Sequence, residues 1–185
     1  MIGLIIVGVI VVLLAVFLIG IYNSLVQLRQ RVQNAWSQVD VQLKRRYDLI
    51  PNLVNAVKGY AQHEKATFET VTQARNMAMN AGSVKEQIQA ENMISGALRS
   101  LFAVAEAYPE LKANTNFLQL QSELSDTESK IAFARQFYND TVQKFNTKIE
   151  LFPNNLVAGM LGFAMVDYFT LQGEPDARQA VKVEF

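Results

Sequence analysis

The chain has 185 residues, of which 17 are Lys or Arg and 17 are Asp or Glu, so its formal net charge is zero. Binding to nucleic-acid phosphates needs a basic excess or stripe, and we therefore expect no nucleic-acid partner. The length suffices for one membrane anchor and one domain, and the absence of Cys does not decide the compartment.

Residues 1–21 form one apolar run without a charge, Asn, Gln or Pro. A helix of this length covers roughly the 30 Å of a bilayer's hydrocarbon core. A cleaved signal peptide would instead have a basic N-terminal region, a shorter apolar core and a small-residue cleavage site. We therefore expect an uncleaved transmembrane helix.

The orientation of the anchor is predicted from the charges that flank it. Arg29 and Arg31 follow the apolar run, and Lys and Arg favour the cytoplasmic side. The sequence therefore predicts an outside N-terminus and a cytoplasmic body.

The anchor is expected to continue directly into a soluble helix, because neither Gly nor Pro occurs between Tyr22 and Tyr47. Apolar residues recur there at spacings of three and four: Leu25, Leu28, Val32, Ala35, Val39 and Leu43. Pro51 predicts a break, since proline is tolerated in a first helical turn and disfavours helix at the residue before it. Asp48 is the predicted N-cap of the next helix.

The helix that Asp48 would cap is the second of the chain, and it is predicted to run to about Ala81, with Gly82 as its stop. Ser83 and Glu86 have the spacing of a capping box and predict the start of the third, which Tyr108 and Pro109 end.

The fourth helix has several candidate caps at residues 114–116 and the clearest apolar seam of the chain. The predicted seam comprises Phe117, Leu120, Leu124, Thr127, Ile131, Ala134, Tyr138, Thr141, Phe145, Lys148 and Phe152, widened by Phe133, Phe137, Val142 and Ile149. Such a wide stripe suits a helix packed against two neighbours. The predicted fold is all-α: an N-terminal transmembrane helix that continues into an antiparallel, up-and-down four-helix bundle.

An uncharged segment at residues 156–166 follows Pro153. It is too short to span a bilayer and too apolar to face water. Three interpretations stay open: a cap on the bundle, insertion at a membrane interface, or burial between subunits. Gly159 and Gly162 would permit a close approach of backbones. Residues 181–185 alternate as a strand does, although an unstructured tail is also expected of a terminus.

Residues that would support catalysis or metal binding are few. His63 is the one histidine, so neither a di-iron bundle nor a two-histidine protease site can form. There is no glycine-rich phosphate loop and no Gly-x-Ser-x-Gly elbow. We predict no catalytic residue, no metal, no cofactor and no nucleotide. The basic cluster at residues 44–46 is expected to pair with acidic residues of a neighbouring helix.

Several stretches of the chain resemble the LemA family. They are residues 34–60 (NAWSQVDVQLKRRYDLIPNLVNAVKGY), 90–113 (AENMISGALRSLFAVAEAYPELKA) and 116–139, together with Tyr22-Asn23 and Phe152-Pro153-Asn154. The resemblance implies a bacterial single-pass protein of the cytoplasmic (inner) membrane with an antiparallel helical bundle. It implies no established enzyme activity.

The expected function is that of a non-enzymatic scaffold on the membrane, which self-associates as a homo-oligomer or binds other membrane proteins. An adaptor or regulator of a membrane protease or envelope signalling system is the alternative. The predicted domains are the anchor (1–21), the bundle (22–152) and the apolar C-terminal segment with its tail (153–185). The predicted interaction surface comprises Trp36, Tyr47, Leu156, Gly159, Met160, Gly162, Phe163 and Phe169.

Overall fold

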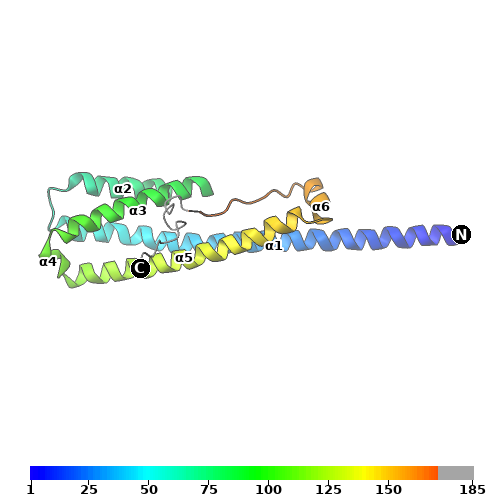
Figure 1. Cartoon of the computed structure of the whole chain (residues 1–185), viewed down its shortest axis with the longest axis horizontal. Helices are drawn as coiled ribbons and strands as arrows, with labels where there is room; N and C mark the ends of the chain where they lie inside the picture. Colours follow the sequence, from blue (N-terminus) through cyan, green and yellow to red (C-terminus); the bar gives the residue numbers. More distant parts are fainter. Residues whose placement is uncertain (171–185) are drawn as a thin grey trace, which may run out of the picture. The chain divides into compact units, whose positions relative to one another are not determined.

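The computed structural model describes residues 1–170, and all their regular secondary structure is helical (Figure 1). The helices are α1 (Ile2–Lys58), α2 (Lys65–Met79), α3 (Val84–Glu106), α4 (Pro109–Lys112), α5 (Thr115–Glu150) and α6 (Asn154–Met160). The tail prediction for residues 181–185 lies outside the described residues.

The N-terminal part of α1 is apolar and exposed. Every residue from 1 to 20 is exposed, and the helix is long and apolar enough to cross a membrane by length and composition. Leu25, the first residue of the predicted stripe, is fully buried. The change from an exposed to a packed helix therefore takes place between residues 20 and 25.

The chain divides into two compact units, to both of which α1 and α5 contribute. The first unit contains residues 1–39 and 134–168, and the second contains residues 40–133 with Phe169. These limits follow packing, whereas the predicted domain limits follow composition and remain predictions.

In the first unit, the chain after α6 runs back along α5. The Asn146 side chain donates to the carbonyl of Val166 and accepts from its N–H, both at 2.9 Å. Farther along, the Tyr138 hydroxyl donates to the carbonyl of Asp167 at 2.9 Å. These bonds satisfy backbone groups that helical pairing leaves free, and they hold residues 166–167 against α5.

In the second unit, α2 and α3 lie side by side, and the end of α1 and the beginning of α5 supply further buried residues. The predicted capping box is present: Ser83 accepts from the N–H of Glu86, and the Glu86 carboxylate accepts from the N–H of Gly82. The Asn114 side chain likewise accepts from the N–H of Phe117 and caps α5.

The seam of α5 is confirmed at its central positions, since Phe117, Leu124, Ile131, Tyr138 and Phe145 are all buried. The widening of this seam was predicted correctly for Val142 and Ile149, which are buried.

The prediction for Phe133 and Phe137 was wrong. Phe133 is 73% exposed and Phe137 is 52% exposed. Both lie on the side of α5 away from its buried seam, where no other element covers them in the described chain.

The predicted helix break at Pro51 was also wrong, because α1 continues through Pro51 to Lys58. A proline inside a helix lacks the N–H that would bond the carbonyl four residues earlier, here that of Tyr47. The Nε of Arg75, on α2, donates to this carbonyl at 2.8 Å. The chain turns instead at Gly59 and the residues after it, and Asp48 lies within α1 rather than capping a new helix.

We predict that Arg75→Ala lowers the free energy of unfolding by about 1–3 kcal/mol, because it leaves the Tyr47 carbonyl unsatisfied. In a Pro51→Ala background the restored N–H can bond that carbonyl, so the same substitution should cost about 1 kcal/mol less. Denaturant unfolding of the four variants, followed by circular dichroism, measures this coupling. Arg45→Ala, at an exposed position of α1, is the control and should change stability by about 0.5 kcal/mol or less. If Arg75→Ala lowered the free energy of unfolding equally in both backgrounds, Arg75 would not be compensating for the N–H that Pro51 lacks.

Candidate interaction surfaces

A cluster of buried polar side chains lies in the second unit, centred on Glu91 of α3. Its carboxylate accepts from the Tyr47 hydroxyl, from Gln87 Nε2 at 3.2 Å and from Arg46 Nη1 at 2.6 Å. The side chains of Arg46 and Glu91 are 4% and 2% exposed. Burying a charge is costly unless it is paired and hydrogen-bonded, and here both charges meet that condition.

Arg46 also links this cluster to two further side chains. Its Nε lies 2.8 Å from Glu128 Oε1 on α5, and its Nη2 donates to Ser95 on α3 at 3.1 Å. The prediction that the basic cluster pairs with acidic residues of neighbouring helices is thus confirmed for Arg46. One guanidinium on α1 thereby connects α1, α3 and α5.

Tyr47 acts in this cluster as a hydrogen-bond donor. Burial, reinforced by the Glu91 carboxylate, raises the pKa of Tyr47 well above its ordinary value of 10.0. The hydroxyl therefore stays protonated at physiological pH, donates to Glu91 and accepts from Gln87 Nε2 at 2.6 Å. These bonds join α1 to α3, and a hydroxyl that stays protonated in this way is not an activated nucleophile.

Sequence reasoning missed Glu91, although a signal for it exists. Glu91, Ile94, Leu98 and Leu101 follow one another at spacings of three and four, which places the carboxylate in the buried stripe of α3. A charge in an apolar stripe indicates a buried partner. Gln87, four residues earlier, lies on the same stripe and is buried too.

The first unit contains a cluster of aromatic rings around Phe163. The ring centroids of Tyr22 and Phe163 lie 6.2 Å apart, and those of Phe145 and Phe163 lie 6.5 Å apart. The Arg29 guanidinium lies 5.2 Å from the centroid of the Phe163 ring, which is within the range of a cation–π interaction. Phe163 thus connects the residues after α6 to both α1 and α5.

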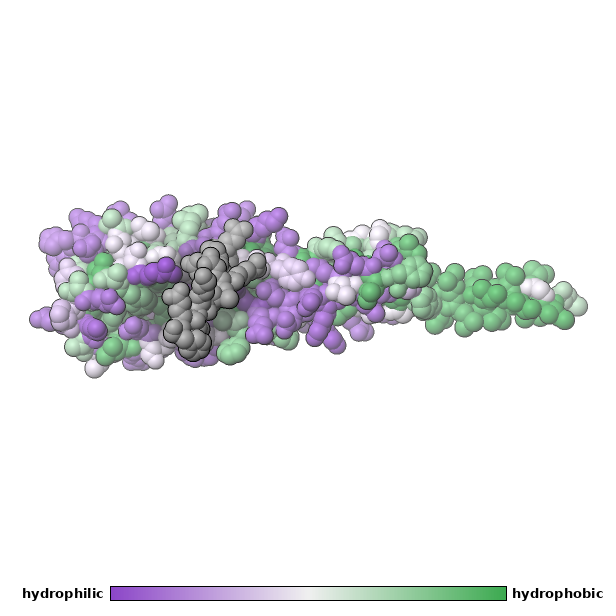
Figure 2. Space-filling model, in the orientation of Figure 1, coloured by the Kyte–Doolittle hydropathy of each residue, from purple (hydrophilic) through white to green (hydrophobic). Residues whose placement is uncertain are grey.

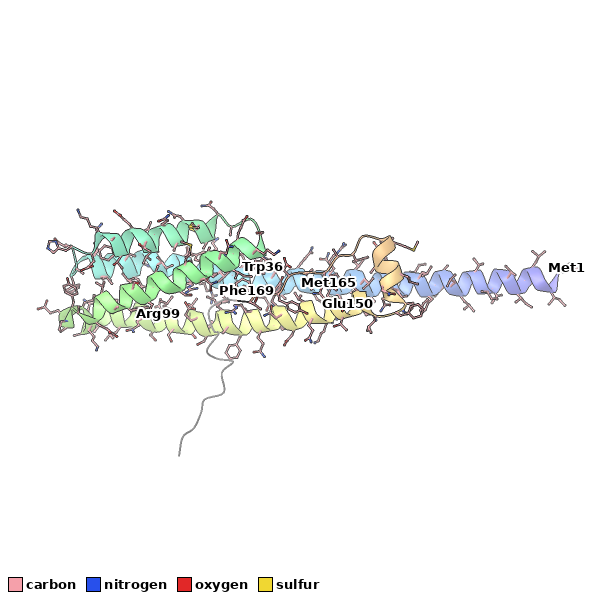
Figure 3. The ribbon with its side chains drawn as sticks, turned by 45° about the horizontal axis from the view of Figure 1, so that its top comes forward. Met1, Trp36, Arg99, Glu150, Met165 and Phe169 are labelled. Carbon is pink, nitrogen blue, oxygen red and sulfur yellow. The ribbon has the colours of Figure 1, made fainter. Side chains whose placement is uncertain are left out.

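The predicted interaction surface is distributed over several environments. Trp36 is half-buried and packs edge-on against Tyr138 with centroids 5.3 Å apart. Figure 3 labels Trp36 and also Phe169, which is fully buried. Tyr47 is buried in the polar cluster. Tyr47 and Phe169 therefore stabilise the interior and do not belong to an exposed surface.

The remaining predicted residues lie around α6. Leu156, Gly159, Met160 and Gly162 are exposed, whereas Phe163 is half-buried. The apolar segment was expected at residues 156–166, but its helix ends at Met160, and Gly162 follows with a φ of +71°. This left-handed conformation favours glycine. A Cβ added at Gly159 or Gly162 would meet no atom within 4 Å, so neither glycine marks a close contact within the chain.

Among residues 1–170, no group of three or more His, Cys, Asp or Glu side chains could hold a metal ion. A groove of about 890 Å³ lies between the end of α1 and α2 in the second unit. Its lining combines apolar side chains such as Ile50 and Phe68 with polar ones such as Gln73 and Asn76.

We predict that Glu91→Ala lowers the free energy of unfolding by about 3–5 kcal/mol, because it leaves the buried Arg46 charge without its main partner. The control is Asp126→Ala, which removes the exposed pair with Lys130 and should cost about 1 kcal/mol or less. Thermal and denaturant unfolding of the full chain in detergent measure both. Similar small losses from the two variants would show that the buried cluster contributes little.

Comparison with known proteins finds one matching family model and several relatives. The family model described as "LemA family" matches residues 35–185. Protein LemA of Metamycoplasma hominis is 32% identical over 158 residues, which cover 82% of this chain and 69% of that protein. Magnetosome protein MamQ 2 of Paramagnetospirillum magneticum and magnetosome protein MamQ of Magnetospirillum gryphiswaldense are each 26% identical over 174 residues. This chain spans 64% of the length of either. On the strength of the family match and of the Metamycoplasma relative, the chain belongs to the LemA family.

Proposed function

We propose that the protein is a non-enzymatic, membrane-anchored helical scaffold that self-associates, binds other membrane proteins, or does both. The observation that carries the proposal is the continuity of α1, whose apolar, exposed beginning leads without a break into a buried stripe. Sixteen of the residues from Ile2 to Ile21 are Val, Leu, Ile or Phe. Each of these residues contributes about 0.3–0.6 kcal/mol to the free energy of insertion, so that together they favour insertion into a bilayer by several kcal/mol.

The body is proposed to be an up-and-down bundle with antiparallel neighbouring helices. Short connections support it: residues 59–64 join α1 to α2, and residues 80–83 join α2 to α3. Short connections make neighbouring helices antiparallel. The bonds of Arg46 to α3 and α5 would then fix the register of the bundle.

The proposed location is a bacterial inner membrane, with the N-terminus outside and the body in the cytoplasm. Arg29 and Arg31 support this orientation, since basic residues next to a span favour the cytoplasmic side. LemA family membership supports the membrane location.

Self-association is proposed to use the outer side of α5. Phe133 is 73% exposed, and burying a phenylalanine side chain is worth roughly 1.5–3 kcal/mol. A second copy of the chain offers the same residue, as a two-fold symmetric contact requires. Such a contact would remove the two Phe133 rings, one from each copy, from water without any change in the fold of the chain.

A scaffold also suits the different settings that the relatives' names indicate. One relative is named simply LemA, whereas others are magnetosome proteins. The groove between α1 and α2 supports the second candidate, an adaptor that holds a segment of a membrane protease or signalling protein. A scaffold would assemble without another polypeptide, whereas an adaptor would stay monomeric or dimeric until its partner is present.

We predict that Phe133→Cys forms disulfide-linked dimers in membranes under mild oxidation. The chain contains no Cys, so each product reports one position. Thr70→Cys, at an exposed polar position on α2, is the matched control and should give far less dimer. Non-reducing electrophoresis measures both variants, and light scattering of the detergent-extracted chain should give a mass above that of one chain. Equal dimer yields, or a monomeric mass, would contradict self-association through α5.

A further inference from the structure

An exposed apolar surface surrounds α6 in the first unit. It comprises five side chains, each more than half exposed: Leu151, Phe152, Leu156, Met160 and Leu161. No charged residue occurs from residue 151 to residue 166. Phe152 and Met160, at 78% and 86%, are almost as exposed as in an extended chain. A patch of this kind marks an interaction site or a membrane contact.

This α6 surface lies at the level where α1 changes from exposed to packed. The ring of Phe163, just after α6, contacts Tyr22, the residue that follows the apolar run. The helix rise of 1.5 Å per residue places Tyr22 within about 2 Å of the end of that run along the helix axis. Figure 2 shows apolar colour on the beginning of α1 and again beside it at α6, both within the first unit.

The α6 surface is also held at this level by the fold. The segment after α6 bonds to Asn146 and Tyr138 of α5, and Phe163 packs between α1 and α5. Figure 3 labels Glu150, which is the last residue of α5, and Met165, which lies in the segment that runs back from α6. The five apolar side chains cannot move away from the end of the span without breaking these contacts.

We propose that the α6 surface is a second membrane contact, which inserts shallowly into the lipid between headgroups and acyl chains. The proposal rests on the anchoring role of α1 proposed above and deepens it. Its partner is the bilayer rather than a second copy of the chain, because the medium around the neighbouring span is lipid on every side. Interfacial segments bury their apolar face, on which phenylalanines such as Phe152 are common, by about 5–10 Å. Tyrosines such as Tyr22 are suited to the boundary itself.

Two basic residues of α1 fit a lipid partner, although the exposed Glu150 directly precedes the α6 surface. Arg29 and Arg31 follow the span by eight and ten residues, so they lie roughly 12–15 Å beyond its end along α1. Basic residues close to the surface are attracted to anionic headgroups. The α6 surface and the span together would hold the first unit to the membrane at two points, and so restrict its tilt.

The test places a single tryptophan on the α6 surface of the full chain. Trp36→Phe removes the only native tryptophan, and Met160→Trp introduces the probe. Phe137→Trp is the matched control, since it is exposed on α5 of the same unit and lies 13 residues, or about 20 Å, before Glu150. Val16→Trp, within the span, reports anchoring.

Each variant is reconstituted in phosphatidylcholine and phosphatidylglycerol vesicles, with or without bromine atoms on the upper acyl chains. The emission of Met160→Trp should fall at least twofold in brominated lipid, as should that of Val16→Trp, whereas Phe137→Trp should be almost unaffected. Phe152→Trp, a conservative aromatic change at an exposed position, should repeat the result of Met160→Trp.

Quenching of Val16→Trp without quenching at positions 160 and 152 would overturn the α6 proposal and leave the anchor intact. A blue-shifted emission at position 160 without bromine quenching would also overturn it, in favour of a second copy as the partner. No quenching at Val16→Trp would overturn the anchor and the α6 contact together.

Discussion

The architecture depends on the continuity of α1, which in the proposed membrane-anchored protein passes from lipid into water. Its first part exposes only apolar side chains, and its later part buries one stripe. Continuity past Pro51 requires a donor for the carbonyl of Tyr47, which Arg75 supplies from α2. The apolar first part and the later part that buries a stripe therefore belong to one continuous helix.

The buried cluster around Glu91 supplies specificity that apolar packing alone does not provide. An apolar stripe can slide by one turn with little penalty, whereas Arg46 can satisfy Glu91, Ser95 and Glu128 only at one register. Buried ionic groups often contribute little net stability compared with apolar replacements. We therefore regard register as the role of this cluster, with Tyr47 kept as a neutral donor by its raised pKa.

Most helices could be predicted from spacing, because periodicity reports burial directly. The seam from Phe117 to Phe145 and the caps at Ser83 and Asn114 follow from such local rules. The continuation of α1 through Pro51 could not be predicted in this way, because it depends on Arg75, which is 24 residues away in the sequence. Exposure of Phe133 also depends on tertiary packing, because a seam flanked by aromatics fits either one or two neighbours. Of the predicted surface, the residues around α6 are available for contact, whereas Tyr47 and Phe169 are interior.

We propose that α1 spans a bilayer and leaves it before the packed part of the helix begins. Single cysteines at Val9 and Gln30 test this placement through their rates of reaction with a membrane-impermeant maleimide in open membrane fragments. We predict that Gln30→Cys reacts readily, whereas Val9→Cys reacts only after the membrane is dissolved and the chain unfolded. Reaction of Val9→Cys in intact membrane at the rate of Gln30→Cys would contradict the account.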